Sequence, residues 1–191
     1  NGVIGPAFRN KGVWRVDVRH SKGDSFGVLV ALPITANDGE DILSLIASVH
    51  DEIQEKNIRF MIKPHPVAAK PESLASLLNA ESNRCEIVEG EFHECLERAQ
   101  LVVGNNSSSL LETVARGIPV LIVGSRRGLT QNPIPEGVDH DLWRLCYTRK
   151  EFLAGLYFYS SQSRQVKERL LEAGRHVRDD YFEPVTEDSV R

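Results

Sequence analysis

Short apolar runs alternate with amphipathic segments along most of this 191-residue chain. The first run, Val28 to Leu32, predicts a buried strand, and apolar residues then recur with helical spacing from Ile42 to Ile53. We predict strands at 28–32, 59–63, 86–88, 101–103, 120–123 and 143–147. We predict helices at about 40–56, from 71 onward, at 91–99, from the serines at 107–109 to 117, at 150–159 and at 164–180. This alternation predicts an α/β fold, a doubly wound parallel sheet of the Rossmann-like type that ends in C-terminal helices.

The first 24 residues lack this regularity. They carry scattered glycines and basic residues and no long periodic element. We therefore predict a linker or the tail of a preceding domain at 1–24, and a Rossmann-like domain at 25–191. The chain begins at Asn1 and its one methionine, Met61, lies inside a predicted strand, so we expect it to be a fragment of a longer protein.

The stretch from Leu101 to Val120 predicts a strand, a turn rich in asparagine and serine, a helix and a second strand. The helix is expected to close at Gly117, with Pro119 just beyond it, so the unit is a βαβ crossover of a parallel sheet. The hydroxyls and backbone N–H groups at the start of such a helix can bind an anion. A ligand that carries phosphate is therefore expected at this turn.

A second motif, Lys63-Pro64-His65-Pro66, ends the strand at 59–63. Each proline biases the preceding residue toward extended backbone, so the strand stops abruptly. Lys63 and His65 are thereby placed at the carboxyl end of a strand. Ligands of open α/β sheets bind at that edge.

Composition and short signatures exclude several classes of protein. A net charge of −4 argues against a general binder of nucleic acid, and no GxGxxG or GK[ST] is present, which excludes the dinucleotide fingerprint and the Walker loop. The three cysteines show no CxxC pairing, which favours a reducing, cytoplasmic setting. This setting is compatible with peripheral association at the inner face of a membrane. No apolar run reaches the ~20 residues of a spanning helix.

The order of these motifs resembles the C-terminal, donor-binding half of a GT-B glycosyltransferase. It is most similar to bacterial surface-polymer enzymes with a K-x-H-P motif, namely polysialyltransferases, capsule Kdo transferases and CDP-glycerol glycerophosphotransferases. The resemblance covers roughly Phe26 to Val123 and includes Glu112 to Val120 after the serine turn. It implies a CMP- or UDP-linked sugar donor, a saccharide or lipid-linked acceptor, an N-terminal domain across the cleft and no cofactor.

The resemblance also implies roles for single residues. His65 would be the catalytic residue and, with Lys63 and Ser107, Ser108 and Ser109, would hold the donor phosphate. Hydrogen-bond donors directed at a leaving phosphate stabilise the negative charge that develops on it. Glu112 would bind the ribose hydroxyls, and the loop Glu89, Gly90 and Glu91 would cradle the base. The resemblance gives no general base, which is expected from the missing domain.

Structural alternatives remain for these residues. His65 is alternatively a turn histidine bonded to a backbone carbonyl, and Lys63 either bridges to the phosphate or points to solvent. Glu112 is also the last residue of an S-x-x-E capping box that begins at Ser109. Both Asn105 and Asn106 are interpreted as residues that satisfy the turn.

No metal site is predicted. Asp139-His140-Asp141 matches the D-x-D signature of a different glycosyltransferase fold, and we interpret it as a solvated turn. Two functions compete with a transferase: a nucleotide-sugar 2-epimerase of the same fold, and a non-catalytic nucleotide-binding module. The glycine pair and paired glutamates that those epimerases carry are absent from the segment 107–112.

Overall fold

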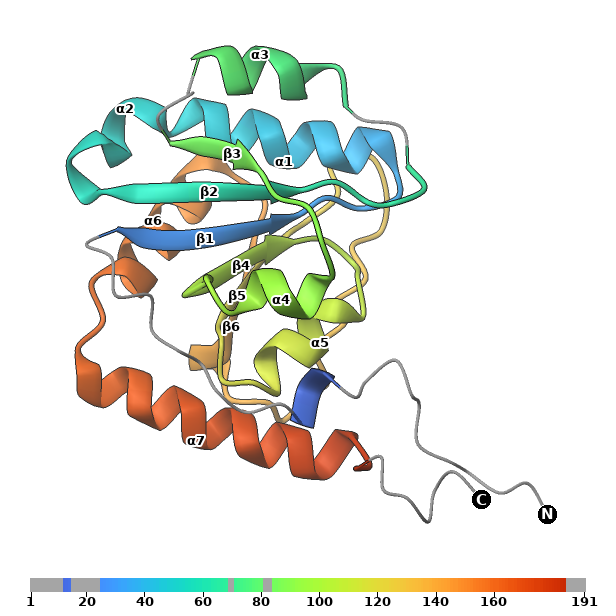
Figure 1. The fold of residues 1–191 in the computed structure, drawn as a ribbon, viewed down its shortest axis with the longest axis vertical. Coiled ribbons are helices and arrows are strands. Elements are labelled where there is room, and N and C mark those ends of the chain that lie inside the picture. Colours follow the sequence, from blue (N-terminus) through green and yellow to red (C-terminus); the bar gives the residue numbers. More distant parts are fainter. Residues whose placement is uncertain (1–11, 15–24, 69–70, 81–83, 185–191) are drawn as a thin grey trace.

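The computed structural model describes residues 12–14, 25–68, 71–80 and 84–184. A six-stranded parallel sheet forms the centre of the molecule, with strand order β3-β2-β1-β4-β5-β6 (Figure 1). The strands are β1 (Phe26–Ala31), β2 (Ile58–Lys63), β3 (Cys85–Ile87), β4 (Leu101–Gly104), β5 (Val120–Val123) and β6 (Trp143–Cys146). The predicted doubly wound sheet is therefore confirmed, including its sixth strand.

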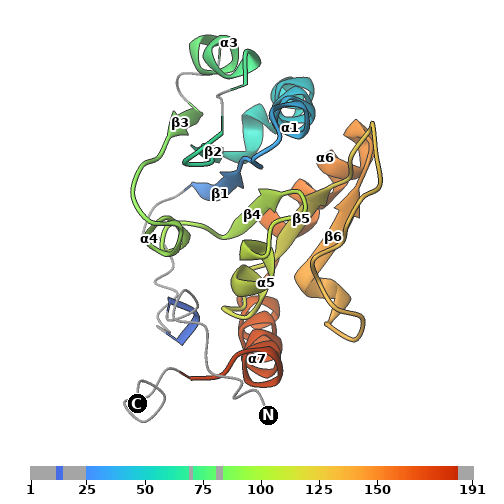
Figure 2. The ribbon, with the colours of Figure 1, turned by 90° about the vertical axis from the view of Figure 1, so that its right-hand side faces the viewer.

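The helices lie in two layers, one on each face of the sheet. They are α1 (Ala36–Ser48), α2 (His50–Ile53), α3 (Ser73–Ala80), α4 (Phe92–Leu96), α5 (Ser109–Val114), α6 (Arg149–Ser160) and α7 (Arg164–Tyr181), with short 3-10 turns at Gln54–Lys56 and His140–Leu142. Figure 2 shows α1 and α6 on one side of the sheet and α4, α5 and α7 on the other. Within the described residues no helix is both long and apolar enough to cross a membrane.

The central strands are buried on both faces because helices cover both. Val28 and Val30 of β1 pack into the core beneath α1 and α6, whereas Leu29 between them packs into the core beneath α4 and α5. All three are fully inaccessible to solvent. Burying one such side chain contributes about 1.5–3 kcal/mol, so the apolar runs read from the sequence also supply most of the stabilisation of the sheet.

Part of the segment expected as a linker packs against this domain. Val13 is buried in the core on the α7 side, and the indole N–H of Trp14 donates to the carbonyl oxygen of Glu183 at 3.2 Å. The Arg178 guanidinium lies 4.8 Å from the centre of the Trp14 ring. These contacts join residues 12–14 to the end of α7.

The strand order places a switch point beside β1. β1 pairs with β2 on one side, with Ala31 opposite Lys63, and with β4 on the other, with Val30 opposite Val103. The connections that leave β1 and β4 therefore run to opposite faces of the sheet. A crevice opens between them at the carboxyl edge, where open α/β sheets bind their ligands.

Candidate functional site

A cleft of about 440 Å³ occupies this switch point, within the range of small-molecule sites. Its walls come from four places that are far apart in the sequence: the ends of β1 and β2, the loop after β3 and the turn after β4. The lining residues are Ala31, Leu32, Pro33, Ile34, Lys63, Pro64, His65, Pro66, Gly90, Glu91, Phe92, Asn106, Ser107 and Ser109. The two motifs recognised separately in the sequence thus line one cleft.

His65 is half-buried at the turn that follows β2. The backbone N–H of Val67 donates to its Nδ1 at 3.4 Å, so in the neutral ring the proton is on Nε2. Through Nδ1 the ring thus bonds a backbone N–H group rather than a backbone carbonyl. The Nε2–H group of the imidazole is therefore left to donate a hydrogen bond to a bound phosphate.

Ser107 and Ser109 form a hydroxyl pair on the opposite wall. Their Oγ atoms are 2.7 Å apart, and the backbone N–H of Ser109 donates to Ser107 Oγ at 3.3 Å. Whichever hydroxyl donates within the pair, the other retains its own proton. One O–H donor is therefore available to a ligand, and the bond that it accepts from its partner polarises it.

Buried hydrogen bonds hold the serine turn in place. Asn105 is buried after β4, and its Nδ2 donates to the carbonyl oxygen of Val123 at 2.8 Å. Thr113, also buried, donates from Oγ1 to the carbonyl oxygen of Ser109 at 2.7 Å. Asn105 thus ties the start of the turn to the end of β5, whereas Asn106 lines the cleft. Since α5 has six residues, the serine hydroxyls are the donors of this wall rather than the dipole of a long helix.

Lys63 does not simply point to solvent from the end of β2. Its Nζ donates to the carbonyl oxygen of Gly90 at 2.5 Å, from the end of β2 to the loop that follows the neighbouring strand β3. That loop is bonded within itself as well, since the backbone N–H of Glu91 donates to Glu94 at 3.2 Å. The bond joins residues 27 apart in the sequence, which the pairing of β2 with β3 brings together, so no local signal predicts it.

Three residues proposed from the sequence are not part of the cleft lining. Ser108 and Glu89 are exposed, and Glu112 is half-buried on α5. The capping box considered for Glu112 needs Ser109 before the helix, whereas α5 begins at Ser109 and its N-cap residue is Ser108.

The cleft also has apolar walls that sequence reasoning missed. Ile34 follows β1 and Phe92 begins α4, and both line the cleft with Pro33 and Pro66. Both residues lie shortly after the carboxyl end of a strand, and this position is the sequence signal that could have indicated them. An aromatic ring beside Gly90 gives the cleft a flat apolar surface next to its polar groups.

Asp139-His140-Asp141 lies at the opposite edge of the sheet. The motif directly precedes β6, so it is on the amino side of the strands. The Asp139 carboxylate accepts from the backbone N–H of Asp141 at 2.8 Å, and Asp141 forms an ion pair with Arg169 of α7. These groups are therefore separated by the full length of a strand from the cleft.

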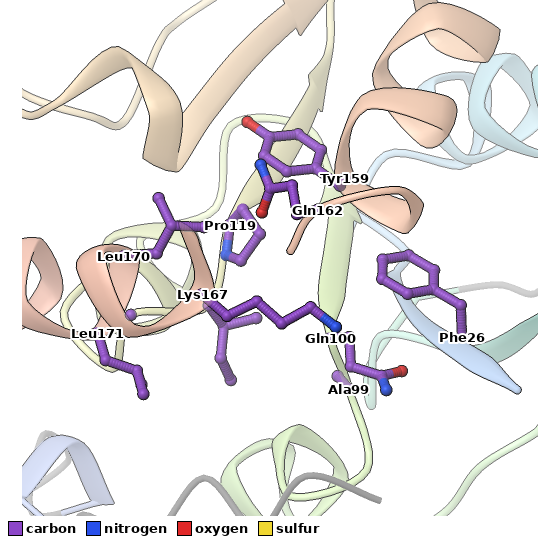
Figure 3. Close-up of a pocket in the computed structure, with 11 residues that line it drawn as sticks. Phe26, Ala99, Gln100, Pro119, Tyr159, Gln162, Lys167, Leu170 and Leu171 are labelled. Atoms are coloured by element: carbon purple, nitrogen blue, oxygen red, sulfur yellow. The ribbon is translucent and has the colours of Figure 1, made fainter. Parts of the chain in front are cut away.

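A second cavity lies at that amino edge and is much smaller. It has a volume of about 30 Å³ and is walled by apolar groups such as Pro119, Leu170 and Leu171 (Figure 3). Figure 3 shows the side chain of Lys167 crossing this space toward Gln100. The volume suffices for one or two water molecules and is too small for a nucleotide.

No family model and no curated protein sequence matches the chain. Solved structures do match its fold. The C-terminal domain of a glycosyl transferase group 1 family protein (LpcC) from Francisella tularensis superposes with a TM-score of 0.58 at 15% identity, covering 94% of this chain and 95% of that domain. A UDP-GlcNAc 2-epimerase from Neisseria meningitidis bound to UDP-GlcNAc gives 0.53 at 14% identity, covering 82% of this chain.

The wall teichoic acid polymerase TagF, soaked with CDPG, matches with a TM-score of 0.51 at 13% identity over 85% of this chain. The chain spans 44% of the length of the epimerase and 38% of that of TagF. The identities are low, so the likeness is one of fold. The chain has the Rossmann-like fold of the C-terminal domains of GT-B glycosyltransferases, a fold that UDP-GlcNAc 2-epimerases share.

Proposed function

We propose that this chain is the nucleotide-sugar-binding domain of a glycosyltransferase that builds a bacterial surface polysaccharide. The observation that carries the proposal is the meeting of His65 with Ser107 and Ser109 in one cleft at the switch point of the sheet. An imidazole N–H on one wall and a serine hydroxyl on the other suit a phosphate held between β2 and β4. The cleft is large enough for a nucleotide beside them.

The chemistry of a transferase fits these donors. When the bond between the sugar and the nucleotide breaks, negative charge develops on the leaving phosphate. The Nε2–H of His65 and the hydroxyl of the serine pair would stabilise this charge, because they are fixed before the reaction begins. The base would lie toward Gly90 and Glu91, where Phe92 supplies an apolar wall.

A second domain on the carboxyl edge of the sheet belongs to this proposal. Among the described residues six large apolar side chains are exposed, and four of these follow the carboxyl ends of strands: Ile34 (61%), Val67 (78%), Leu129 (95%) and Tyr147 (45%). Apolar side chains exposed along one edge of a sheet suit contact with another protein surface. An N-terminal domain there would cover the cleft and supply the general base and the acceptor site.

Titration of the purified chain with CMP, UMP, CDP and UDP tests the proposal. Without the second domain, we expect weak binding with a Kd of about 0.1–1 mM. Amide signals of residues 63–66 and 105–109 in NMR spectra should shift together. Binding that moves other residues, or no binding of any of the four, would remove the support for a donor site.

A 2-epimerase remains the second candidate, supported by the fold shared with the Neisseria meningitidis enzyme. The two functions differ in what happens to a nucleotide sugar without an acceptor. A longer protein that contains this chain would convert UDP-GlcNAc into its 2-epimer if it were an epimerase, and would leave it intact if it were a transferase. Proton NMR of the nucleotide sugar distinguishes these outcomes.

A further inference from the structure

The loop Glu89–Glu91 has a backbone shape that only glycine accommodates at its centre. Gly90 has φ of +95°, and a Cβ on it would stand 2.9 Å from Oε2 of Glu94. Residues with side chains rarely adopt this conformation. The loop is exposed, so packing alone does not fix it, and its position depends on the hydrogen bonds made by its backbone.

Three side chains form hydrogen bonds to the backbone of this loop. The thiol of Cys95 donates to the carbonyl oxygen of Glu89 at 3.6 Å, and Glu94 accepts from the N–H of Glu91 at 3.2 Å. Both partners lie in α4, the helix that the loop itself starts. The third bond, from Lys63 to the Gly90 carbonyl oxygen, comes from the end of β2, the strand that pairs with β3. It fixes the distance between the loop and the His65 turn.

From this arrangement we infer that Lys63 is a positioning residue, which holds the 89–91 loop where it receives the base, and is not a ligand of the donor phosphate. The inference rests on the proposed function. An ammonium group has three N–H donors and bonds strongly to a carbonyl oxygen. The bond to Gly90 ties the loop to the end of β2 before any nucleotide binds, so loss of Lys63 would free the loop whether or not the ligand carries a phosphate.

The first test needs no ligand. Lys63→Met keeps the length of the side chain and removes its donors, while Lys150→Met, at an exposed position of α6, serves as the control. We expect the amide signals and hydrogen-exchange protection of Gly90 and Glu91 to change in Lys63→Met only. Unchanged signals at both residues would overturn the inference.

The second test compares cytidine with CMP, and uridine with UMP. A positioning role predicts that Lys63→Met lowers the affinity for the nucleoside and for the nucleotide by the same factor. That factor should be about 3- to 10-fold, the loss of one net hydrogen bond. If Lys63 instead binds the phosphate, the substitution would lower the affinity for the nucleotide and leave the affinity for the nucleoside unchanged. That result would overturn the inference. If the unmodified chain binds none of these compounds, the proposed function fails, and the ligand-free measurement still decides whether Lys63 holds the loop.

Discussion

Gly174 of α7 and Gly117 after α5 are in direct backbone contact. A Cβ on residue 174 would stand 2.5 Å from Cα of Gly117 and 2.7 Å from the carbonyl oxygen of Val114. Gly117 in turn has φ of +73°, and its own Cβ would meet the backbone of Leu171 at 2.6 Å. Two glycines thus allow α7 to lie directly against the turn between α5 and β5.

We predict that Gly174→Ala destabilises the protein by about 1–3 kcal/mol, because the backbone of α7 must move away from Gly117. Alanine has the higher helix propensity by about 1 kcal/mol, so propensity alone predicts the opposite sign. Urea unfolding measures the difference. Gly155→Ala in α6 is the matched control, since its Cβ would meet a methyl group of Leu121 at 2.6 Å. A side-chain methyl can shift, so a smaller loss is expected there.

His65→Ala should weaken nucleotide binding by about tenfold or more, the loss expected for a hydrogen bond to a charged group. The melting temperature should stay nearly unchanged, because Pro64 and Pro66 already restrict the turn. His65→Gln, which places an amide donor near Nε2, should recover part of the affinity. Calorimetric titration and thermal unfolding of the same samples separate the two effects. A drop in affinity that follows a drop in stability would contradict the assignment.

The two neighbouring serines should behave differently. Ser107 lines the cleft and Ser108 does not. Ser107→Ala removes the hydroxyl that bonds both Ser109 Oγ and the Ser109 N–H, so nucleotide affinity should fall about threefold to tenfold. Ser108→Ala should bind nucleotide like the unmodified chain. Equal losses in the two variants would show that the hydroxyl pair is not part of the site.

Glu151 should make stability depend on pH in the acid range. Its carboxylate accepts from the backbone N–H of Tyr147 at 2.9 Å and from Thr148, and these bonds lower its pKa. The stabilisation is present above the pKa of the unfolded chain, about 4.5, and is lost as the pH falls through the lower pKa of the folded state.

Glu151→Gln should therefore flatten the fall in unfolding free energy below pH 4.5. At neutral pH it should cost less than about 1 kcal/mol, because the group is exposed. Urea unfolding at a series of pH values measures both effects. Glu136→Gln, at an exposed position before β6, controls for the loss of one negative charge. An acid limb with the same slope in both variants would refute the role of Glu151.

Periodicity predicted which elements exist better than where they end. The helix expected at about 40–56 begins at Ala36 and is interrupted at Val49, and the segment ends at Asn57, which has a positive φ. Asp38, in the first turn of this helix, accepts from Ser125 Oγ at 3.2 Å. That bond joins residues 87 apart, so a local rule for helix starts could not have shown it.

The site was predictable to the extent that it depends on strand ends. His65 and the serine turn each follow a strand directly, so the parallel topology alone brings them to one edge. The bond from Lys63 to Gly90 and the walls formed by Ile34 and Phe92 were missed. They depend on the path of loops between elements, which apolar periodicity does not encode.

The central place of β1 also determines when the cleft can exist during synthesis. β1 can pair with β2 once residues 58–63 have been synthesised, but its other edge has no partner until β4 follows, some forty residues later. An open strand edge is a template for wrong pairing with another chain. A nascent or truncated chain that stops before β4 therefore carries Lys63 and His65 beside an unpaired central strand, and is the form most exposed to aggregation.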